Sequence, residues 1–141
     1  MKEIIDIKIE TVMIENNTGG FANCYIGLPK GHPWHKMHYE DIEERCSETR
    51  EVHGGLTYSE DRVRVPTSKD EPKGLWWVGF DTKHDEDNKE NCDREFCEQE
   101  IVKLVKIAME DLARFQHSCS TNYQNLFRGR PGPQGEIMNP K

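Results

Sequence analysis

The chain has 141 residues, of which 34% are hydrophobic and 32% are charged, which is enough for one hydrophobic core but not for two. Its net charge is −7, from 26 acidic and 19 basic side chains. This excess of acid argues against general nucleic-acid binding, which needs a clustered Lys/Arg surface. No stretch approaches the roughly 20 apolar residues of a membrane-spanning helix, so we expect one soluble domain that does not cross a membrane.

The cysteines favour a reduced, cytoplasmic protein. Their number is odd and no Cys-x-x-Cys pair occurs, so the sequence predicts neither a disulfide framework nor a thiolate zinc site. The five are Cys24, Cys46, Cys92, Cys97 and Cys119. The N-terminal residues, with Lys2 and Glu3 among them, also lack the apolar core of a secretion signal.

The first segment of the chain predicts an antiparallel hairpin over residues 4–28. Hydrophobic and polar residues alternate from Ile5 to Met13, which is the period of a strand with one buried face. The Asn/Gly-rich run 15–20 follows and is typical of a turn. Residues 21–28 then supply the second strand of the hairpin.

Three shorter elements are expected in the middle of the chain. Residues 39–45 have room for one or two helical turns. Residues 51–60 have apolar side chains at even-numbered positions, as in a strand, but Gly54 and Gly55 interrupt the pattern and weaken that prediction. Residues 75–81 are aromatic and β-branched and predict a strand. The charged run 83–90 has no apolar anchor and is expected to be a loop.

From about Asp93 the hydrophobic period changes to 3.6 and predicts a helix over residues 93–115. Its apolar stripe, expected to pack on the Ile5/Ile7/Ile9 face, consists of Phe96, Ile101, Leu104, Val105, Ala108, Met109, Leu112 and Phe115. Residues 118–141 are rich in Gly and Pro and are expected to form an extended or flexible tail behind a single domain at 1–117. The predicted fold is therefore α+β, an antiparallel sheet of four to five strands packed against one long C-terminal helix.

Three segments combine a strand end with Gly, His or Asp. They are residues 27–34 (GLPKGHPW), residues 52–58 (VHGGLTY) and residues 76–84 (WWVGFDTKH). If the strands are neighbours, these ends gather at one edge of the sheet, where loops commonly build binding sites.

A metal site is one interpretation of these segments. The candidate ligands are His32, His35 and His38, spaced by three, with His53, Asp81, His84, Asp85 and Asp87 as further nitrogen and oxygen donors. A spacing of three gathers side chains only on a helix, and Pro33 argues against one. No His-Glu-x-x-His signature is present. Ser59, Thr57 or a cysteine could pair with His53 as a nucleophile, but the Gly-x-Ser-x-Gly motif typical of such a serine is absent. The sequence therefore favours loop histidines without a metal or other cofactor.

A binding pocket without catalysis is the other interpretation. Trp76, Val78 and Phe80 share one face of the predicted strand, and Trp77 and Asp81 share the other. If the helix covers the first face, Trp77 lies near His53 and Thr57, as a flat aromatic surface suited to a nucleobase. The alternative is that Trp77 packs as an ordinary sheet residue or at an oligomer contact.

The three phrases together resemble a family of small phage- and prophage-encoded proteins, over roughly residues 20–90. Members of that family have Tyr-Gly or similar residues in place of His35-Lys36, and a Gly in place of Glu86. The first of these departures marks His35 and His38 as local features of this chain and weakens the triple-histidine site.

The resemblance implies a counter-defence role in the cytoplasm of a host cell. The leading expectation is an oligomeric sponge for a cyclic-nucleotide immune signal, similar to the Thoeris anti-defence proteins. A metal-dependent hydrolase of a phosphorylated ligand, and an anti-CRISPR or anti-restriction protein whose acidic surface binds a host nuclease, are the alternatives; we lean against an enzyme. For the sponge, the expected ligand-binding residues are Trp77, Phe80 and Tyr58 for stacking, His53, Thr57, Asp81 and His84 for polar contacts, and Arg128 and Arg130 for phosphate charge from a second subunit.

Overall fold

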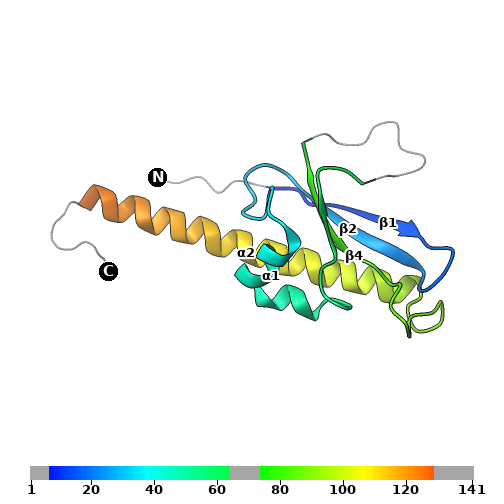
Figure 1. Cartoon of the computed structure of the whole chain (residues 1–141). Coiled ribbons are helices and arrows are strands. Elements are labelled where there is room, and N and C mark those ends of the chain that lie inside the picture. The colour runs from blue at the N-terminus through cyan, green and yellow to red at the C-terminus, as the bar shows by residue number, and fades with distance from the viewer. Residues whose placement is uncertain (1–6, 64–73, 129–141) are drawn as a thin grey trace.

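The computed structural model describes residues 7–63 and 74–128, and the side chains within them as far as Ser118. It confirms the predicted α+β class: a four-stranded antiparallel sheet packs against a long C-terminal helix (Figure 1). The strand order is β1-β2-β4-β3. The elements are β1 (Glu10–Glu15), β2 (Ala22–Leu28), α1 (Tyr39–Arg45), the 3-10 turn η1 (Ser47–Glu51), β3 (Tyr58–Glu60), β4 (Trp76–Phe80) and α2 (Arg94–Arg128).

The predicted hairpin is confirmed, but its first strand begins later than expected. β1 pairs with β2 from Glu10↔Gly27 to Glu15↔Ala22. Alternation alone predicted a strand from Ile5, but residues 7–9 take no part in the described ladder, and residues 1–6 lie outside the described residues. The strand begins where a partner is available, since hydrogen bonds to a neighbour, and not periodicity, define a sheet.

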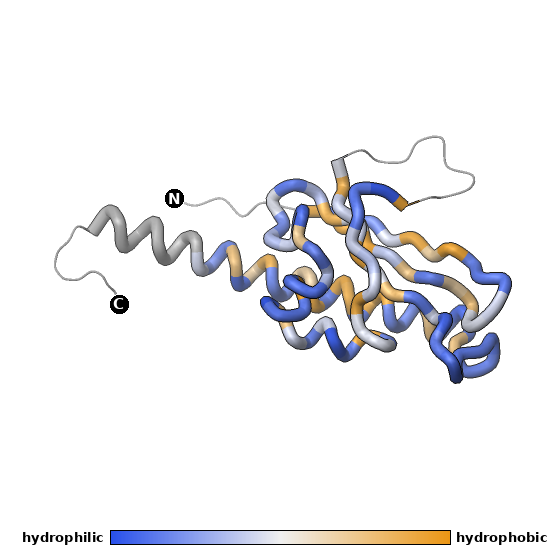
Figure 2. Tube along the Cα trace, in the orientation of Figure 1, coloured by the Kyte–Doolittle hydropathy of each residue, from blue (hydrophilic) through white to orange (hydrophobic). Residues whose placement is uncertain are grey.

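The core lies between the central strands and α2. Alternate residues of β2 point at the helix and are fully buried: Ala22, Cys24, Ile26 and Leu28. Val78 and Phe80 of β4 join them, as predicted for that face, with Leu104 and Ala108 among their partners on α2. Of the expected acceptor face, Ile9 packs against this core as a partly buried residue, Ile7 is buried, and Ile5 lies outside the described residues. Figure 2 shows hydrophobic residues in the strands and the first part of α2, and hydrophilic ones in the loop after β4.

Helix α2 begins as predicted and extends further than predicted. Asp93 caps it, because its Oδ1 accepts the Phe96 backbone N–H at 2.9 Å. The helix continues to Arg128, so residues 118–128 are helical rather than extended, and residues 129–141 lie outside the described part.

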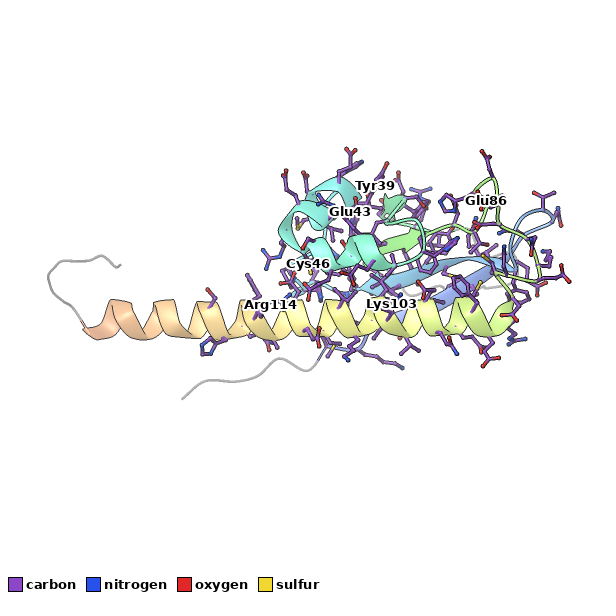
Figure 3. All side chains as sticks on the ribbon, turned by 90° about the horizontal axis from the view of Figure 1, so that it is seen from below. Tyr39, Glu43, Cys46, Glu86, Lys103 and Arg114 are labelled. Atoms are coloured by element: carbon purple, nitrogen blue, oxygen red, sulfur yellow. The ribbon has the colours of Figure 1, made fainter. Side chains whose placement is uncertain are left out.

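The buried face of α2 also differs from the predicted stripe. Met109 and Phe115 are 40% and 38% exposed, whereas Ile107 and Asp111 are buried. The reason is a second layer: α1 and η1 cover α2 beside the sheet (Figure 3). Arg114 reaches Cys46 Sγ at 3.7 Å, and Lys103 donates to the Glu51 carbonyl at 3.3 Å.

The GLPKGHPW segment is tied to α2. His32 Nε2 donates to the Ala108 carbonyl at 2.8 Å, and Nδ1 accepts the Trp34 backbone N–H at 3.0 Å. Trp34 Nε1 donates to Asp111 Oδ2 at 2.6 Å. Both ring nitrogens of His32 are therefore used in holding the segment on the helix.

The three histidines His32, His35 and His38 do not converge. His35 Nε2 donates to the Gly74 carbonyl, and His38 Nδ1 caps α1 by accepting the Glu40 backbone N–H. They form no metal-ligand group among the described residues. As predicted from Pro33, no helix runs through His32, so the spacing of three has no geometric meaning here.

Burial lowers the pKa of His32, against a smaller opposing effect of its bond to the Ala108 carbonyl. The unfolded chain, with a histidine pKa of about 6.5, then takes up a proton that the folded state resists. We expect the free energy of unfolding to fall as pH drops below about 6.5, with a His32 contribution of at most about 1.4 kcal/mol per pH unit. Urea denaturation between pH 7 and 5 should give a shallower slope for His32→Gln. The exposed His117→Gln should keep the wild-type slope; equal slopes for all three proteins contradict this.

Candidate metal centre

Strand pairing decides which of the three segments meet. β4 is antiparallel to β2, with Leu28 opposite Trp76 and Cys24 opposite Phe80. The segment after β2 therefore lies at the opposite end of the sheet from the segment after β4. β3 is also antiparallel to β4, with Tyr58 opposite Gly79, so the residues before β3 meet the residues after β4. Two of the three predicted segments, 52–58 and 76–84, therefore meet at one end of the sheet, and residues 27–34 lie at the other end (Figure 1).

At that end of the sheet, donor atoms from three residues converge. His53 Nε2 lies 2.9 Å from Asp87 Oδ2 and 3.0 Å from Oδ1. The Cys92 thiol donates to Asp87 Oδ1 at 3.5 Å and lies 3.8 Å from His53 Nε2. One nitrogen, one oxygen and one sulfur donor thus lie within 4.8 Å of one another.

A second imidazole lies beside this group. His84 Nδ1 is 2.8 Å from Asp87 Oδ2, and the His84 backbone N–H donates to the same oxygen at 2.9 Å. The His84 ring meets the His53 ring edge to face, with centroids 5.1 Å apart. On its other side, His84 Nε2 lies 3.8 Å from Asp81 Oδ1. Cys92 is buried and the Asp87 side chain is 7% exposed, whereas the side chains of His84 and Asp81 are open to solvent in part.

The double glycine builds the first half of the site. Gly54 and Gly55 have φ of +73° and +80°, a left-handed pair that reverses the chain between η1 and β3. Residues 51–60 are therefore not one strand, and only Tyr58–Glu60 pairs with β4. The His53 backbone N–H donates to buried Glu100 Oε1 at 2.9 Å, and Leu56 N–H donates to Glu43 Oε2 at 2.8 Å. α1 and α2 thus fix the turn from both sides.

The charged loop builds the second half. Asn88 Oδ1 accepts the backbone N–H groups of Glu90 and Asn91 at 2.8 Å, and the Cys92 N–H donates to the Asn88 carbonyl at 2.9 Å. Lys89 Nζ reaches over to the Asn16 carbonyl. These bonds fold residues 84–92 back, so that Asp87 and Cys92 meet. The sequence interpretation missed Cys92; its spacing of five from Asp87, just before a helix cap, was the available signal.

The three donors shift one another's protonation. Burial alone would raise the pKa of Asp87, but hydrogen bonds from His53 and His84 outweigh it and hold that pKa well below its usual range. Burial raises the pKa of the Cys92 thiol to about 11, and the Asp87 carboxylate adds to the effect. The cluster therefore concentrates negative charge on Asp87, between two imidazoles and a protonated thiol.

A Cys-His-Asp nucleophile is not what this geometry supports. In such a triad the histidine uses one ring nitrogen for the nucleophile and the other for the acid. Here His53 presents the same atom, Nε2, to both Asp87 and Cys92. The Cys92 thiol is 2% exposed and its raised pKa keeps it protonated at neutral pH, which is the reverse of an activated cysteine.

Two of the three rings expected to stack on a ligand are buried, and the third is half-buried. Trp77 and Phe80 are each 1% exposed, and Phe80 lies in the core under α2. Tyr58 packs its edge against Tyr25 at 5.0 Å and donates its hydroxyl to the Arg62 carbonyl. Capture of a nucleotide stays a prediction, without the aromatic platform that it assumed.

The remaining predicted residues are spread out. Thr57 is exposed, and its backbone N–H donates to the Gly79 carbonyl at 2.9 Å. Arg128 ends α2, at the opposite end of the helix from Cys92, and Arg130 lies outside the described residues. Of the predicted polar contacts, the structure brings together His53, His84 and Asp81.

An apolar groove of about 470 Å³ lies between β1 and α2, away from these polar side chains. Its lining includes Ile9, Met13, Ile101 and Val102, and Val102 is 66% exposed. The predicted homo-oligomer stays a prediction.

Comparison of the chain with models of protein families, with curated proteins and with solved structures gives no match. Within the described residues, no helix has the length and apolar content to cross a membrane.

Proposed function

We propose that this protein binds a divalent transition-metal ion, with Zn²⁺ as the preferred ion, through His53 Nε2, an Asp87 carboxylate oxygen and Cys92 Sγ. The observation that carries the proposal is the convergence of these three donor atoms within 4.8 Å, where a histidine 34 residues before Asp87 meets the Asp87–Cys92 loop. Hydrogen bonds join the three groups. A cation bound between them would take the place of the bridging protons and deprotonate the thiol.

The donor set selects the kind of metal. Mg²⁺ and Ca²⁺ bind oxygen ligands almost exclusively, so a thiolate and an imidazole disfavour them. Zn²⁺ accepts sulfur, nitrogen and oxygen together, at distances of about 2.0–2.3 Å. Cys92 is buried and the Asp87 side chain is only 7% exposed, so a cation here would balance a carboxylate charge that water solvates poorly. We place the protein in a cytoplasm, where thiols such as Cys92 stay reduced.

The test is a zinc titration of the whole chain by calorimetry, starting from chelator-treated protein. We expect saturable binding of one zinc ion per chain, with a rise in melting temperature on addition of zinc and none on addition of Mg²⁺. His53→Ala should weaken the binding at least about tenfold, since a ligand is lost. His117→Ala removes an exposed imidazole from α2 and should bind as the wild type does. Wild-type protein that does not bind zinc, or a His53→Ala variant with unchanged affinity, rejects the site.

A further inference from the structure

The site has a fourth candidate donor, and the next step, which rests on the proposed zinc binding, concerns its role. We infer that His84 Nδ1 is the fourth zinc ligand and that Asp81 orients its ring, so that the site is closed by four protein ligands, one Cys, two His and one Asp. This distinguishes a structural site from a catalytic one, which keeps a position open for water.

The position of Nδ1 is the first argument. It already lies 2.8 Å from Asp87 Oδ2, the oxygen that His53 Nε2 also approaches to 2.9 Å. Both imidazoles therefore aim a nitrogen at the same carboxylate oxygen, from two directions. An ion held by Asp87 and His53 would have the Nδ1 lone pair of His84 as its neighbouring donor.

The second argument is the partner of the other ring nitrogen. Histidine ligands of zinc usually give their second N–H to a carboxylate or a carbonyl, which fixes the tautomer and the ring orientation. His84 Nε2 faces Asp81 Oδ1 at 3.8 Å. Asp81 follows β4 directly, and its other visible role is to accept the Lys83 backbone N–H at 3.2 Å. The rigid strand end thus supplies the carboxylate at the side of His84 that faces away from the ligand group.

The third argument is the close contact between the His84 ring and the backbone of Gly54. His84 lies against the backbone of Gly54, where an added Cβ would collide with its Cε1 and Nε2 atoms. Gly54 therefore allows the left-handed turn that positions His53, and its missing side chain lets the His84 ring lie against the backbone.

A closed site links three parts of the chain. Its ligands come from the turn before β3, the loop after β4 and the residue before the cap of α2. The ion would therefore hold the start of α2 against the edge of the sheet, where the Phe21 N–H already donates to the Cys92 carbonyl at 2.7 Å. Its effect is on folding, and the site has no position at which to activate water.

Cobalt reports the ligand number, because tetrahedral Co²⁺ absorbs strongly in the visible and its thiolate adds a near-ultraviolet band. We expect wild-type protein loaded with Co²⁺ to give this spectrum and to keep it when azide or free imidazole is added. His84→Ala should bind Co²⁺ at least about tenfold more weakly, and imidazole should restore both affinity and spectrum by filling the vacated position. His84→Asn, which keeps a polar group next to Asp87, serves if the alanine variant does not fold, and the same loss is expected. His38→Ala is the matched control and should be unchanged.

Three outcomes have distinct meanings. A wild-type spectrum that shifts with azide shows an open position and overturns the closed site. Unchanged affinity in His84→Ala and His84→Asn overturns the role of His84, while zinc binding by His53, Asp87 and Cys92 stands. Wild-type protein that binds neither Co²⁺ nor Zn²⁺ rejects the proposed function and this inference with it.

Discussion

Replacement of Asp87 by asparagine is expected to lower zinc affinity at least about 100-fold. Asp87 is the residue on which the cluster converges, since His53 contacts both of its oxygens, His84 contacts Oδ2 and Cys92 contacts Oδ1. An amide keeps the size of the side chain but loses the charge that balances the cation. Competition titration with a chromophoric zinc chelator measures the change directly.

The control is Asp85→Asn, the same chemical change two residues away at an exposed position. It should leave zinc affinity at the wild-type value. If both variants bind equally well, the affinity comes from the general acidity of the loop, and Asp87 is not a ligand.

Replacement of Asp111 by alanine should remove about 3 kcal/mol from the free energy of unfolding. Asp111 is buried, and its Oδ2 accepts from Trp34 Nε1 at 2.6 Å and from Arg45 Nε at 2.9 Å. Alanine would leave the buried indole N–H without an acceptor and the Arg45 guanidinium without its partner. Arg45 is partly exposed and retains some hydration, which keeps the loss at the lower end for a buried pair.

Urea denaturation measures this loss, and Glu110→Ala is its control. Glu110 precedes Asp111 on α2 but is exposed, so its removal should change the free energy of unfolding by no more than about 0.5 kcal/mol. Equal stability of the two variants would show that the Trp34–Asp111–Arg45 contacts contribute little. Zinc affinity should be unchanged in both, because the cluster lies at the other end of the sheet.

The sequence predicted the elements whose hydrophobic period is long and regular. The strand at 76–80 and the start of α2 follow from such patterns, and the short helix at 39–45 was placed correctly. The pattern did not locate the start of β1, because alternation continues beyond the last residue that has a partner. It also failed at residues 51–60, where Gly54 and Gly55 reverse the chain.

The apolar stripe of α2 was only partly predictable. Periodicity assigns the helix one buried face, but α1 and η1 add a second contact. Asp111 is buried because it accepts a hydrogen bond from Arg45 of α1, and Glu100 is buried because it accepts one from the backbone N–H of His53, just after η1. Polar residues buried for this reason do not appear in a hydrophobic pattern. Only the packing of the two layers shows which polar positions are internal.

By itself, the sequence determined that the chain is α+β, that Gly and His mark its loops, and which residue types are available for a site. It also contained His53, His84 and Asp87 among many possible metal donors. The tertiary structure alone decided which of them meet, because antiparallel pairing places the residues before β3 beside those after β4 and sends His32 to the opposite end. A donor atom acquires a role from its distance to other donors, and for residues 34 and 39 positions apart in the chain that distance is set by the sheet and the folded loop.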